Sequence, residues 1–212
     1  MGYDDDMLSI ENLACIKGGR PLFKGVSFNV GAGELFHIEG ENGAGKTSLL
    51  RILSGLSRPE FGCVLWNGLD IVDSREVYLD QVLYLGHHPA IKDSLTVLEN
   101  LRFSIRLSGV DVEEAVLQQI LSEVSLSERL HLPARFLSQG QRRRLVLAKL
   151  WIQRNKPLWI LDEPFTALDV NAIALLVNRL EEHLTAGGSI ILTSHQPPEV
   201  ADGFVRSIGL GR

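Results

Sequence analysis

The chain has 212 residues, of which 45% are hydrophobic and 22% are charged. A chain of this length buries roughly 70% of the surface that its unfolded form exposes, so we expect one well-packed domain rather than two. The 26 acidic side chains outnumber the 21 basic ones and give a net charge of -5. The proportions of hydrophobic and charged residues exclude a disordered chain. The net negative charge argues against general binding of nucleic acid or anionic lipid.

The cysteines and the N-terminus fit a reducing compartment. Cys15 and Cys63 are the only cysteines, and without a CxxC spacing they support neither a zinc site nor a disulfide framework. Residues 1–6 lack the basic start and the apolar core of a signal peptide, so we expect no secretion. The longest apolar run, residues 172–177, is far shorter than the roughly 18 to 20 residues that cross a bilayer. We therefore expect any membrane role to be peripheral.

Short strands and a glycine-rich loop are predicted in the first part of the chain. Residues 8–30 alternate in polarity around a turn, which predicts two strands joined by that turn. Residues 34–39 read ELFHIE and predict a strand that leads directly into glycines. The apolar period of residues 48–56 predicts a helix after those glycines, and further strands are predicted at residues 62–72 and 81–85.

The middle of the chain is predicted to be helical. The predicted helices span residues 96–107, 111–124 and 138–154. Thr96 and Glu99 form a capping box that opens the first helix, and Asp111 is expected to open the second. This change from strands to helices predicts an inserted helical part.

The last third alternates between strands and helices. Residues 158–161 and 189–193 are continuous apolar runs of strand length, and residues 170–184 between them have a helical period. A strand, a helix and a strand in this order, with wholly apolar strands, predict a buried parallel sheet. The pattern places the chain in the α/β class.

A phosphate-binding loop is predicted at residues 40–47, which match GxxxxGK[ST] between a predicted strand and a predicted helix. The glycines let successive backbone N–H groups turn toward phosphate oxygens, and the following helix adds the positive end of its dipole. Lys46 would reach the β and γ phosphates, Thr47 would bind Mg²⁺, and Ser48 is included in the nucleotide site. An accidental glycine-rich turn is the alternative, which the flanking strand and helix disfavour. The motif consists of Gly40, Glu41, Asn42, Gly43, Ala44, Gly45, Lys46 and Thr47.

Two carboxylates follow the apolar strand at residues 158–161. Parallel strands open into a ligand crevice at their C-terminal ends, where Asp162 and Glu163 stand. Asp162 would hold Mg²⁺ through water, and Glu163 would orient and deprotonate the attacking water. By itself an Asp-Glu pair after a core strand is more often an acidic turn, but the phosphate-binding loop favours the catalytic interpretation.

His195 follows the strand at residues 189–193 and is also expected at a C-terminal strand end. A lone histidine at such a position is more often structural. The functional alternative is a hydrogen-bond donor to the γ phosphate that senses whether this phosphate is present.

The remaining motifs resemble those of the ABC ATPase family. Residues 137–141, reading LSQGQ, resemble the LSGGQ signature and lie between the phosphate-binding loop and the Asp-Glu strand, in the family's order. Residues 167–169 resemble the D-loop, and His195 resembles the switch histidine. The resemblance covers nearly the whole chain. It implies a P-loop NTPase fold with a mixed sheet, an antiparallel β subdomain and an inserted helical subdomain at about residues 92–150, all in one domain spanning residues 1–212.

The same resemblance implies two composite ATP sites in a head-to-tail dimer. In the family the signature residues reach the phosphate-binding loop of a second copy, which assigns Ser138, Gly140, Gln141 and Asp169 to nucleotide binding. A capped helix N-terminus suits this role because it is a phosphate-binding surface. Taken alone, however, the capping box of Ser138 with Gln141 is structural.

Within this family the chain is most similar to ATP-binding subunits of haem exporters for cytochrome c maturation. The similar stretches are residues 86–89 (GHHP), 158–171 (LWILDEPFTALDVN) and 194–197 (SHQP). This resemblance implies a peripheral subunit on the cytoplasmic side of the bacterial inner membrane, paired with an integral membrane transporter subunit. Haem would then concern this chain only indirectly.

Two positions depart from the family's pattern. Most relatives have a glutamine where His88 stands, and that residue touches Mg²⁺ and couples to the membrane subunit. Histidine donates or accepts a hydrogen bond there with a different reach and a titratable charge. Lys17 stands where many relatives carry an aromatic residue that stacks on adenine, and a lysine covers a base less well. We expect weaker base selectivity.

Two other functions are alternatives. A non-hydrolytic, nucleotide-dependent docking module is compatible with His88, but Glu163 and His195 argue against it. A soluble ABC ATPase acting on DNA or ribosomes usually carries two such domains or long insertions, which this acidic chain lacks. An ATPase subunit of a transporter is therefore the prediction.

Overall fold

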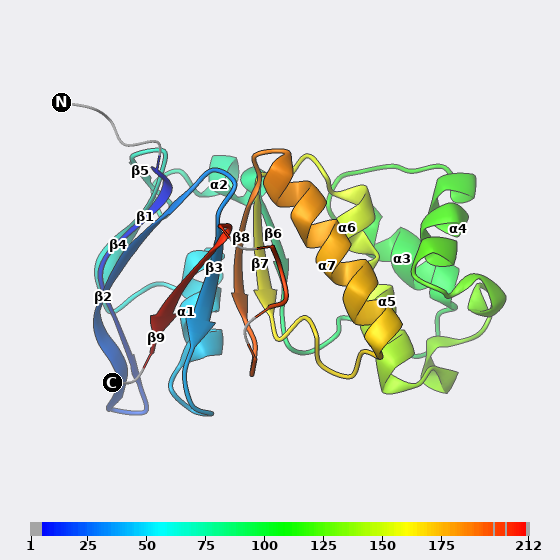
Figure 1. The fold of residues 1–212 in the computed structure, drawn as a ribbon, viewed down its shortest axis with the longest axis horizontal. Helices are drawn as coiled ribbons and strands as arrows, with labels where there is room; N and C mark the ends of the chain where they lie inside the picture. The colour runs from blue at the N-terminus through cyan, green and yellow to red at the C-terminus, as the bar shows by residue number, and fades with distance from the viewer. Residues whose placement is uncertain (1–5, 197, 202, 211–212) are drawn as a thin grey trace. The chain divides into compact units, whose positions relative to one another are not determined.

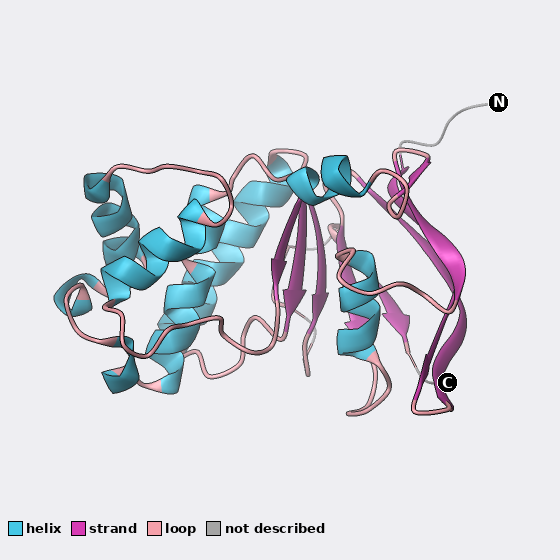
Figure 2. Cartoon of the chain, turned by 180° about the vertical axis from the view of Figure 1, so that it is seen from behind, coloured by secondary structure: helices cyan, strands magenta, loops and turns pink. Residues whose placement is uncertain are grey.

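The structure is a computed structural model that describes residues 6–196, 198–201 and 203–210 (Figure 1). Its contacts divide the chain into two compact units. The first unit comprises Met1–Gly86, Asn155–Glu163 and Leu180–Arg212, and the second comprises His87–Arg154 and Pro164–Arg179. Figure 2 shows strands in the first unit and only helices and loops in the second.

An antiparallel sheet forms one layer of the first unit, with the strand order β2-β1-β4-β5. The strands are β1 (Asp6–Lys17), β2 (Arg20–Gly31), β4 (Phe61–Trp66) and β5 (Leu69–Asp70). Gly18 and Gly19, both with positive φ, make the tight turn between β1 and β2. The two strands predicted over residues 8–30 and the hairpin within residues 62–72 are confirmed.

A parallel sheet forms the second layer of this unit, with the order β6-β7-β8-β3-β9. The strands are β3 (Leu35–Glu39), β6 (Val82–Leu85), β7 (Leu158–Asp162), β8 (Ser189–Thr193) and β9 (Val205–Gly209). All neighbouring pairs run parallel, as the apolar strands predicted. Every residue of β7 and β8 is buried, because a parallel sheet is covered on both faces.

The hydrophobic core of the first unit joins the two sheets through helix α1 (Lys46–Leu53). Leu8 and Val64 come from the antiparallel sheet, Ile160 and Ile191 from the parallel sheet, and Leu49 from α1. The helix at the end of the glycine-rich loop is therefore fixed in the core. A further helix, α2 (Arg75–Gln81), precedes β6.

The second unit is helical. Its elements are α3 (Val97–Arg106), α4 (Glu114–Glu123), the 3₁₀ turns η1 (Ser127–Arg129) and η2 (Ala134–Phe136), α5 (Gln139–Leu147), α6 (Lys149–Ile152) and the first part of α7 (Val170–Thr185). The predicted capping box of α3 is confirmed. The Thr96 hydroxyl accepts from the Glu99 backbone N–H at 3.2 Å, and a Glu99 carboxylate oxygen accepts from the Thr96 backbone N–H at 2.8 Å.

Two details of the helix predictions were wrong. Helix α4 begins at Glu114 without a side-chain cap, because Asp111 pairs with Arg106 at 3.3 Å instead. The single helix predicted over residues 138–154 is divided at Ala148 into α5 and α6.

Helix α2, strand β9 and the two 3₁₀ turns were not predicted. β9 reads VRSIG, which lacks the apolar run that marks a core strand, and its residues are exposed or only partly buried. It forms because β3 offers a free edge, with Leu35 opposite Val205 and Glu39 opposite Gly209. Within the described residues, no helix has the length and apolarity that crossing a bilayer requires.

Candidate functional site

The glycine-rich loop at residues 40–45 lies between β3 and α1 and needs its glycines. Gly40, Gly43 and Gly45 all have positive φ angles of 150°, 89° and 98°. A Cβ atom on Gly40 would lie 2.7 Å from the carbonyl oxygen of Leu210, and one on Gly45 would lie 3.1 Å from Cβ of Leu22. The backbone therefore curls tightly into the N-terminus of α1, whose first N–H groups and dipole favour an anion.

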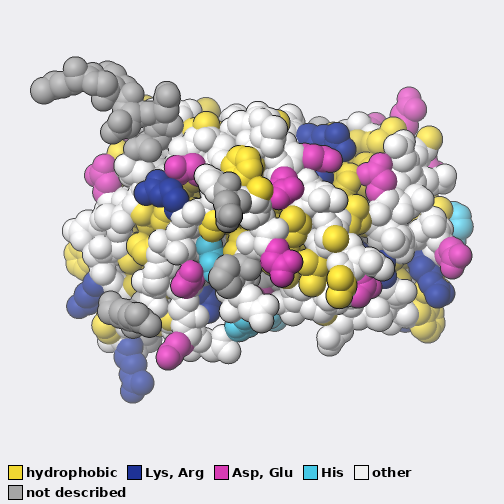
Figure 3. All heavy atoms as spheres, viewed as in Figure 1, with side chains coloured by type: hydrophobic (Ala, Val, Ile, Leu, Met, Phe, Trp, Pro, Cys, Tyr) yellow, Lys and Arg dark blue, Asp and Glu magenta, His cyan; other side chains and the backbone are white. Residues whose placement is uncertain are grey.

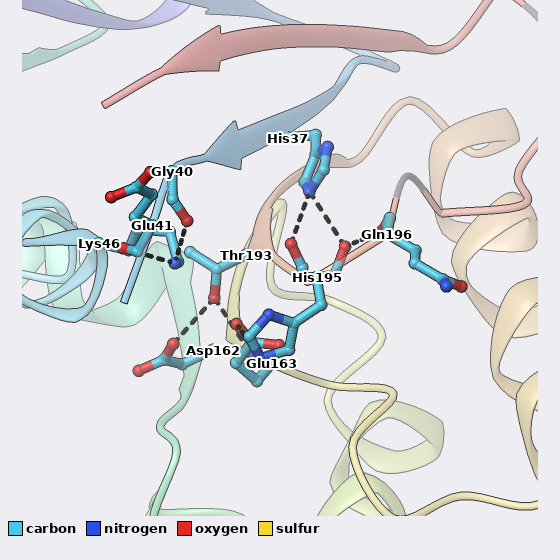
Figure 4. Close-up of polar contacts among 10 residues, drawn as sticks. His37, Gly40, Glu41, Lys46, Asp162, Glu163, Thr193, His195 and Gln196 are labelled. Carbon is cyan, nitrogen blue, oxygen red and sulfur yellow. Dashed lines mark hydrogen bonds and ion pairs between the residues drawn. The ribbon is translucent and has the colours of Figure 1, made fainter. Parts of the chain in front are cut away.

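Lys46 is the first residue of α1 and is buried, with 8% of its surface exposed. Its Nζ donates to the carbonyl oxygen of Gly40 at 2.6 Å and to that of Glu41 at 3.3 Å (Figure 4). The ammonium group is thus held at the loop rather than extended into solvent. A cation beside curled backbone amides provides the charge and the donors that a phosphate chain needs.

The carboxyl groups of Asp162 and Glu163 stand at the end of β7. Asp162 is 1% exposed, and its Oδ1 accepts from the Thr193 hydroxyl at 2.8 Å. Glu163 has a positive φ of 51°, which is uncommon for a residue with a side chain, and its backbone N–H donates to the same hydroxyl at 3.0 Å. One hydroxyl therefore holds both acidic residues in position.

Strand register places these carboxylates beside the glycine-rich loop. Thr193 lies opposite Asp162 on one side and opposite Ile38 on the other. Neighbouring strands are about 4.8 Å apart, so Ile38 and Asp162 are separated by about 10 Å. All three strands run in the same direction, and the loop begins two residues after Ile38. Lys46 and Asp162 thus belong to the same edge of the sheet, in agreement with Figure 4.

Tyr84 of β6 interacts electrostatically with Asp162 at this edge of the sheet. Burial, followed by the charge of Asp162, raises the pKa of the Tyr84 hydroxyl, while Arg51 acts in the opposite direction. Tyr84 therefore stays a neutral hydroxyl beside the carboxylate.

His195 follows β8 and faces Glu163. Its Nε2 lies 3.8 Å from Glu163 Oε1, while 68% of the histidine side chain and only 12% of the glutamate side chain are exposed. Most of the histidine ring is therefore open to solvent. The first unit thus contains the glycine-rich loop, Lys46, both carboxylates and His195 together.

Thr193 was missed by the sequence analysis, although one signal was present. It is a hydroxyl residue at the C-terminal end of a wholly apolar strand, next in the sheet to the Asp-Glu strand. We expect Thr193→Val to lower the free energy of unfolding by about 1.5 to 3 kcal/mol, since hydrogen bonds to charged groups contribute that much. The kcat of the predicted ATP hydrolysis should fall about tenfold, because Glu163, the predicted base, loses its anchor.

Thr193→Ser is the matched control, because it keeps the hydroxyl and should retain both stability and turnover within about threefold. Denaturant unfolding and steady-state ATP hydrolysis measure the two effects. Full activity in Thr193→Val would show that the hydroxyl does not position the carboxylates.

The signature-like segment belongs to the second unit. Ser138 caps α5: its hydroxyl accepts from the Gln141 N–H at 3.2 Å, and the Gln141 side-chain oxygen accepts from the Ser138 N–H at 2.9 Å. A Cβ on Gly140 would lie 2.7 Å from the carbonyl oxygen of Ala167, so only glycine permits this approach. Asp169 caps α7 by accepting from the Ala172 N–H at 2.8 Å. Nucleotide binding by these residues stays a prediction.

The two departures from the family's pattern are both on the surface. Lys17 is the exposed last residue of β1, opposite Arg20 in the hairpin whose Leu22 lies against Gly45. His88 is exposed in the second unit, and its ring meets His87 edge-on at 5.2 Å between centroids. The predicted contact of Lys17 with adenine and that of His88 with Mg²⁺ stay predictions.

A curled glycine loop, a buried lysine and strand-end carboxylates on a parallel sheet define a P-loop nucleotide-binding protein. Comparisons with known proteins narrow this class. The family model for ABC transporters matches residues 23–166. The chain is 52% identical over 202 residues to the cytochrome c biogenesis ATP-binding export protein CcmA of Aromatoleum aromaticum, covering 92% of this chain and 94% of that protein.

Other relatives and solved structures agree. CcmA of Escherichia coli strain K12 is 47% identical over 204 residues, with 96% of each chain covered. A solved ATP-binding subunit of an ABC transporter superposes with a TM-score of 0.78 at 30% identity, covering 89% of this chain and 79% of that one. A putative ABC transporter ATP-binding protein from Pyrococcus furiosus gives 0.80 at 25% identity, with 96% of each chain covered.

The chain belongs to the ABC transporter family and, within it, to the family of the CcmA export proteins. The predicted family and α/β P-loop fold are thereby confirmed. As a member, the chain binds ATP and hydrolyses it in transport, which rules out the non-hydrolytic docking module and the ATPase that takes no part in transport.

Proposed function

We propose that this chain is the ATP-binding subunit of a membrane exporter that serves the biogenesis of c-type cytochromes. The observation that carries this proposal is the 47% to 52% identity to proteins named for that role over more than 90% of the chain. The chain would supply the energy, and an integral membrane subunit would supply the path. Haem would concern this chain only indirectly, and its place would be the cytoplasmic face of the bacterial inner membrane.

In this proposal residues 40–48 hold the triphosphate, and Lys46 contacts the β and γ phosphates. Glu163 accepts a proton from the attacking water, and His195 donates to the γ phosphate. The 3.8 Å between His195 Nε2 and Glu163 Oε1 supports a shared task, since both would face the same phosphate. Lys17 would lie near the base.

Oxygen donors at the sheet edge fit Mg²⁺. The buried carboxylate of Asp162 and the hydroxyl of Thr47 at the start of α1 are hard ligands, and Mg²⁺ is usually bound by one or two such groups together with substrate phosphates. His88 is proposed as a further contact. When bound, the ion would neutralise charge on the phosphates.

The proposal includes a head-to-tail dimer when ATP is bound. The hydroxyl of Ser138 and the first turn of α5 are exposed or half-buried, which leaves the helix N-terminus accessible to a phosphate. Gly140, Gln141 and Asp169 would join this contact with the second copy. Residues 1–212 would then act as one ABC ATPase domain, with a helical subdomain at about residues 92–150. On the face shown in Figure 3, basic and acidic side chains are interspersed.

Complementation tests the proposed function. The chain is expressed in an Escherichia coli strain that lacks its own CcmA, and covalently bound haem in c-type cytochromes is measured, together with the membrane proteins that copurify with the chain. We expect restored cytochromes and a copurifying integral membrane subunit. A chain that reaches the membrane with its partner but restores no cytochrome would contradict the proposed cargo.

A further inference from the structure

His37 is a buried polar residue that the roles assigned above do not use. It lies in the middle of β3, between Leu192 of β8 and Ser207 of β9, and 2% of its surface is exposed. A buried imidazole in a parallel sheet needs hydrogen-bond partners, since an unsatisfied polar group there is costly. Its partners therefore indicate what the ring does.

The ring contacts Ser194, the residue directly before His195. His37 Nε2 lies 3.0 Å from the Ser194 hydroxyl and 3.3 Å from the Ser194 carbonyl oxygen. The Ser194 hydroxyl donates to the carbonyl oxygen of Gln196. A hydroxyl has one proton, so the Ser194 oxygen must accept from His37, and we assign the proton to Nε2.

The other ring nitrogen lies near a carboxylate. His37 Nδ1 is 3.4 Å from a carboxylate oxygen of Glu39, two residues along the same strand. With the proton on Nε2, Nδ1 and the carboxylate are both acceptors, so this contact is not a hydrogen bond. The hydrogen bond to Ser194 is therefore the one that orients the ring.

These hydrogen bonds involve both sequence neighbours of His195. Ser194 precedes it and contacts His37, and Gln196 follows it and accepts a hydrogen bond from the Ser194 hydroxyl (Figure 4). The His195 side chain is 68% exposed and so has little packing of its own to hold it at 3.8 Å from Glu163. The backbone on both sides must set its position instead.

We propose that His37 is a positioning residue for ATP hydrolysis, which acts by holding the turn at residues 194–196 so that His195 faces Glu163 and the γ phosphate. This inference rests on the role proposed above for His195. It gives β3 two tasks, since the same strand leads into the phosphate-binding loop. A residue of this kind affects turnover rather than ATP binding.

Kinetics of two variants test the proposal in the full chain, copurified with its membrane partner. His37→Leu removes the hydrogen bond to Ser194, and we expect kcat to fall about tenfold while KM for ATP stays within about twofold, because the turn loses its support but the phosphate-binding loop is unchanged. His37→Gln should restore kcat to within about threefold of the original, since its amide can donate to Ser194. Full kcat in His37→Leu would overturn the proposal.

Ser189→Ala is the matched control for stability. Ser189 stands at the other end of β8 and donates to the carbonyl oxygen of Gly31 at 2.6 Å. Its loss removes a comparable, partly buried hydrogen bond at the opposite end of β8 from Ser194, so the melting temperature should fall about as far as in His37→Leu, with kcat unchanged. An equal loss of kcat in both variants would show a merely structural effect. Should His37→Leu fail to fold, Ser194→Ala removes the hydroxyl that joins His37 to Gln196, and the same fall in kcat is expected.

The background variant His195→Ala separates this inference from the proposed function. If His37 acts through His195, adding His37→Leu to His195→Ala lowers kcat no further. A further fall would overturn the inference. If His195→Ala alone left kcat unchanged, the role proposed for His195 would be wrong. Hydrogen exchange of residues 194–196 would then test whether His37 holds the turn. Exchange about tenfold faster in His37→Leu than in Ser189→Ala supports the proposal that His37 holds the turn, and equal exchange contradicts that proposal.

Discussion

ATP turnover is expected to stop when Glu163 is replaced by glutamine, while ATP binding persists. Glutamine keeps the size of the side chain at a position with a φ of 51°, and the backbone N–H can still donate to Thr193. The negative charge of the carboxylate and its ability to accept a proton are lost. A general base contributes about 100-fold to 10,000-fold to the rate, so kcat should fall by that factor. Phosphate release measures turnover, and equilibrium binding of labelled ATP measures affinity.

The same variant tests the proposed dimer. With ATP bound and hydrolysis blocked, two copies should remain associated, and light scattering in ATP should give twice the monomer mass. Glu60→Gln is the matched control, because it makes the same chemical change at an exposed glutamate next to β4. It should leave turnover unchanged. Normal hydrolysis by Glu163→Gln would remove Glu163 from the catalytic role.

Replacement of Lys46 by alanine is expected to weaken ATP binding itself. The buried ammonium group is fixed at the glycine loop by the carbonyl oxygens of Gly40 and Glu41, where a phosphate chain would lie. A hydrogen bond between charged groups contributes about 1.5 to 3 kcal/mol, which corresponds to an affinity about 10-fold to 150-fold lower. Calorimetric titration with ATP measures this change.

Lys24→Ala provides the control for Lys46→Ala. Lys24 is an exposed lysine on β2, so its removal changes the net charge equally without touching the loop. ATP affinity should then stay within about twofold, since an exposed charge is screened by solvent. If Lys46→Ala bound ATP as tightly as Lys24→Ala, the loop would not be the triphosphate site.

Local sequence patterns correctly predicted the features whose interacting residues lie within a few positions of one another. The spacing of glycines and lysine in residues 40–47 predicted a loop between strand and helix, and the structure has that loop between β3 and α1. The capping boxes at Thr96 and Ser138 were also confirmed. In each case the partners are three to seven positions apart, so the sequence order itself brings them together.

Helix ends and edge strands were predicted less well because neighbours decide them. Asp111 has the residue type of a helix cap, but its pairing with Arg106 leaves α4 to begin at Glu114. β9 carries no apolar run, and its strand conformation depends on the hydrogen bonds that β3 offers. Such choices depend on tertiary contacts that override local propensity.

The sequence by itself determined the phosphate-binding loop, the two carboxylates after a buried strand and the family to which they belong. The tertiary structure alone decided which side chains support them. Thr193 meets Asp162 across 31 positions, and His37 meets Ser194 across 157, through the parallel pairing of β8 with β7 and β3. Hydrogen bonds between strands depend on register, and register follows from how the whole sheet packs, which a one-dimensional pattern does not contain.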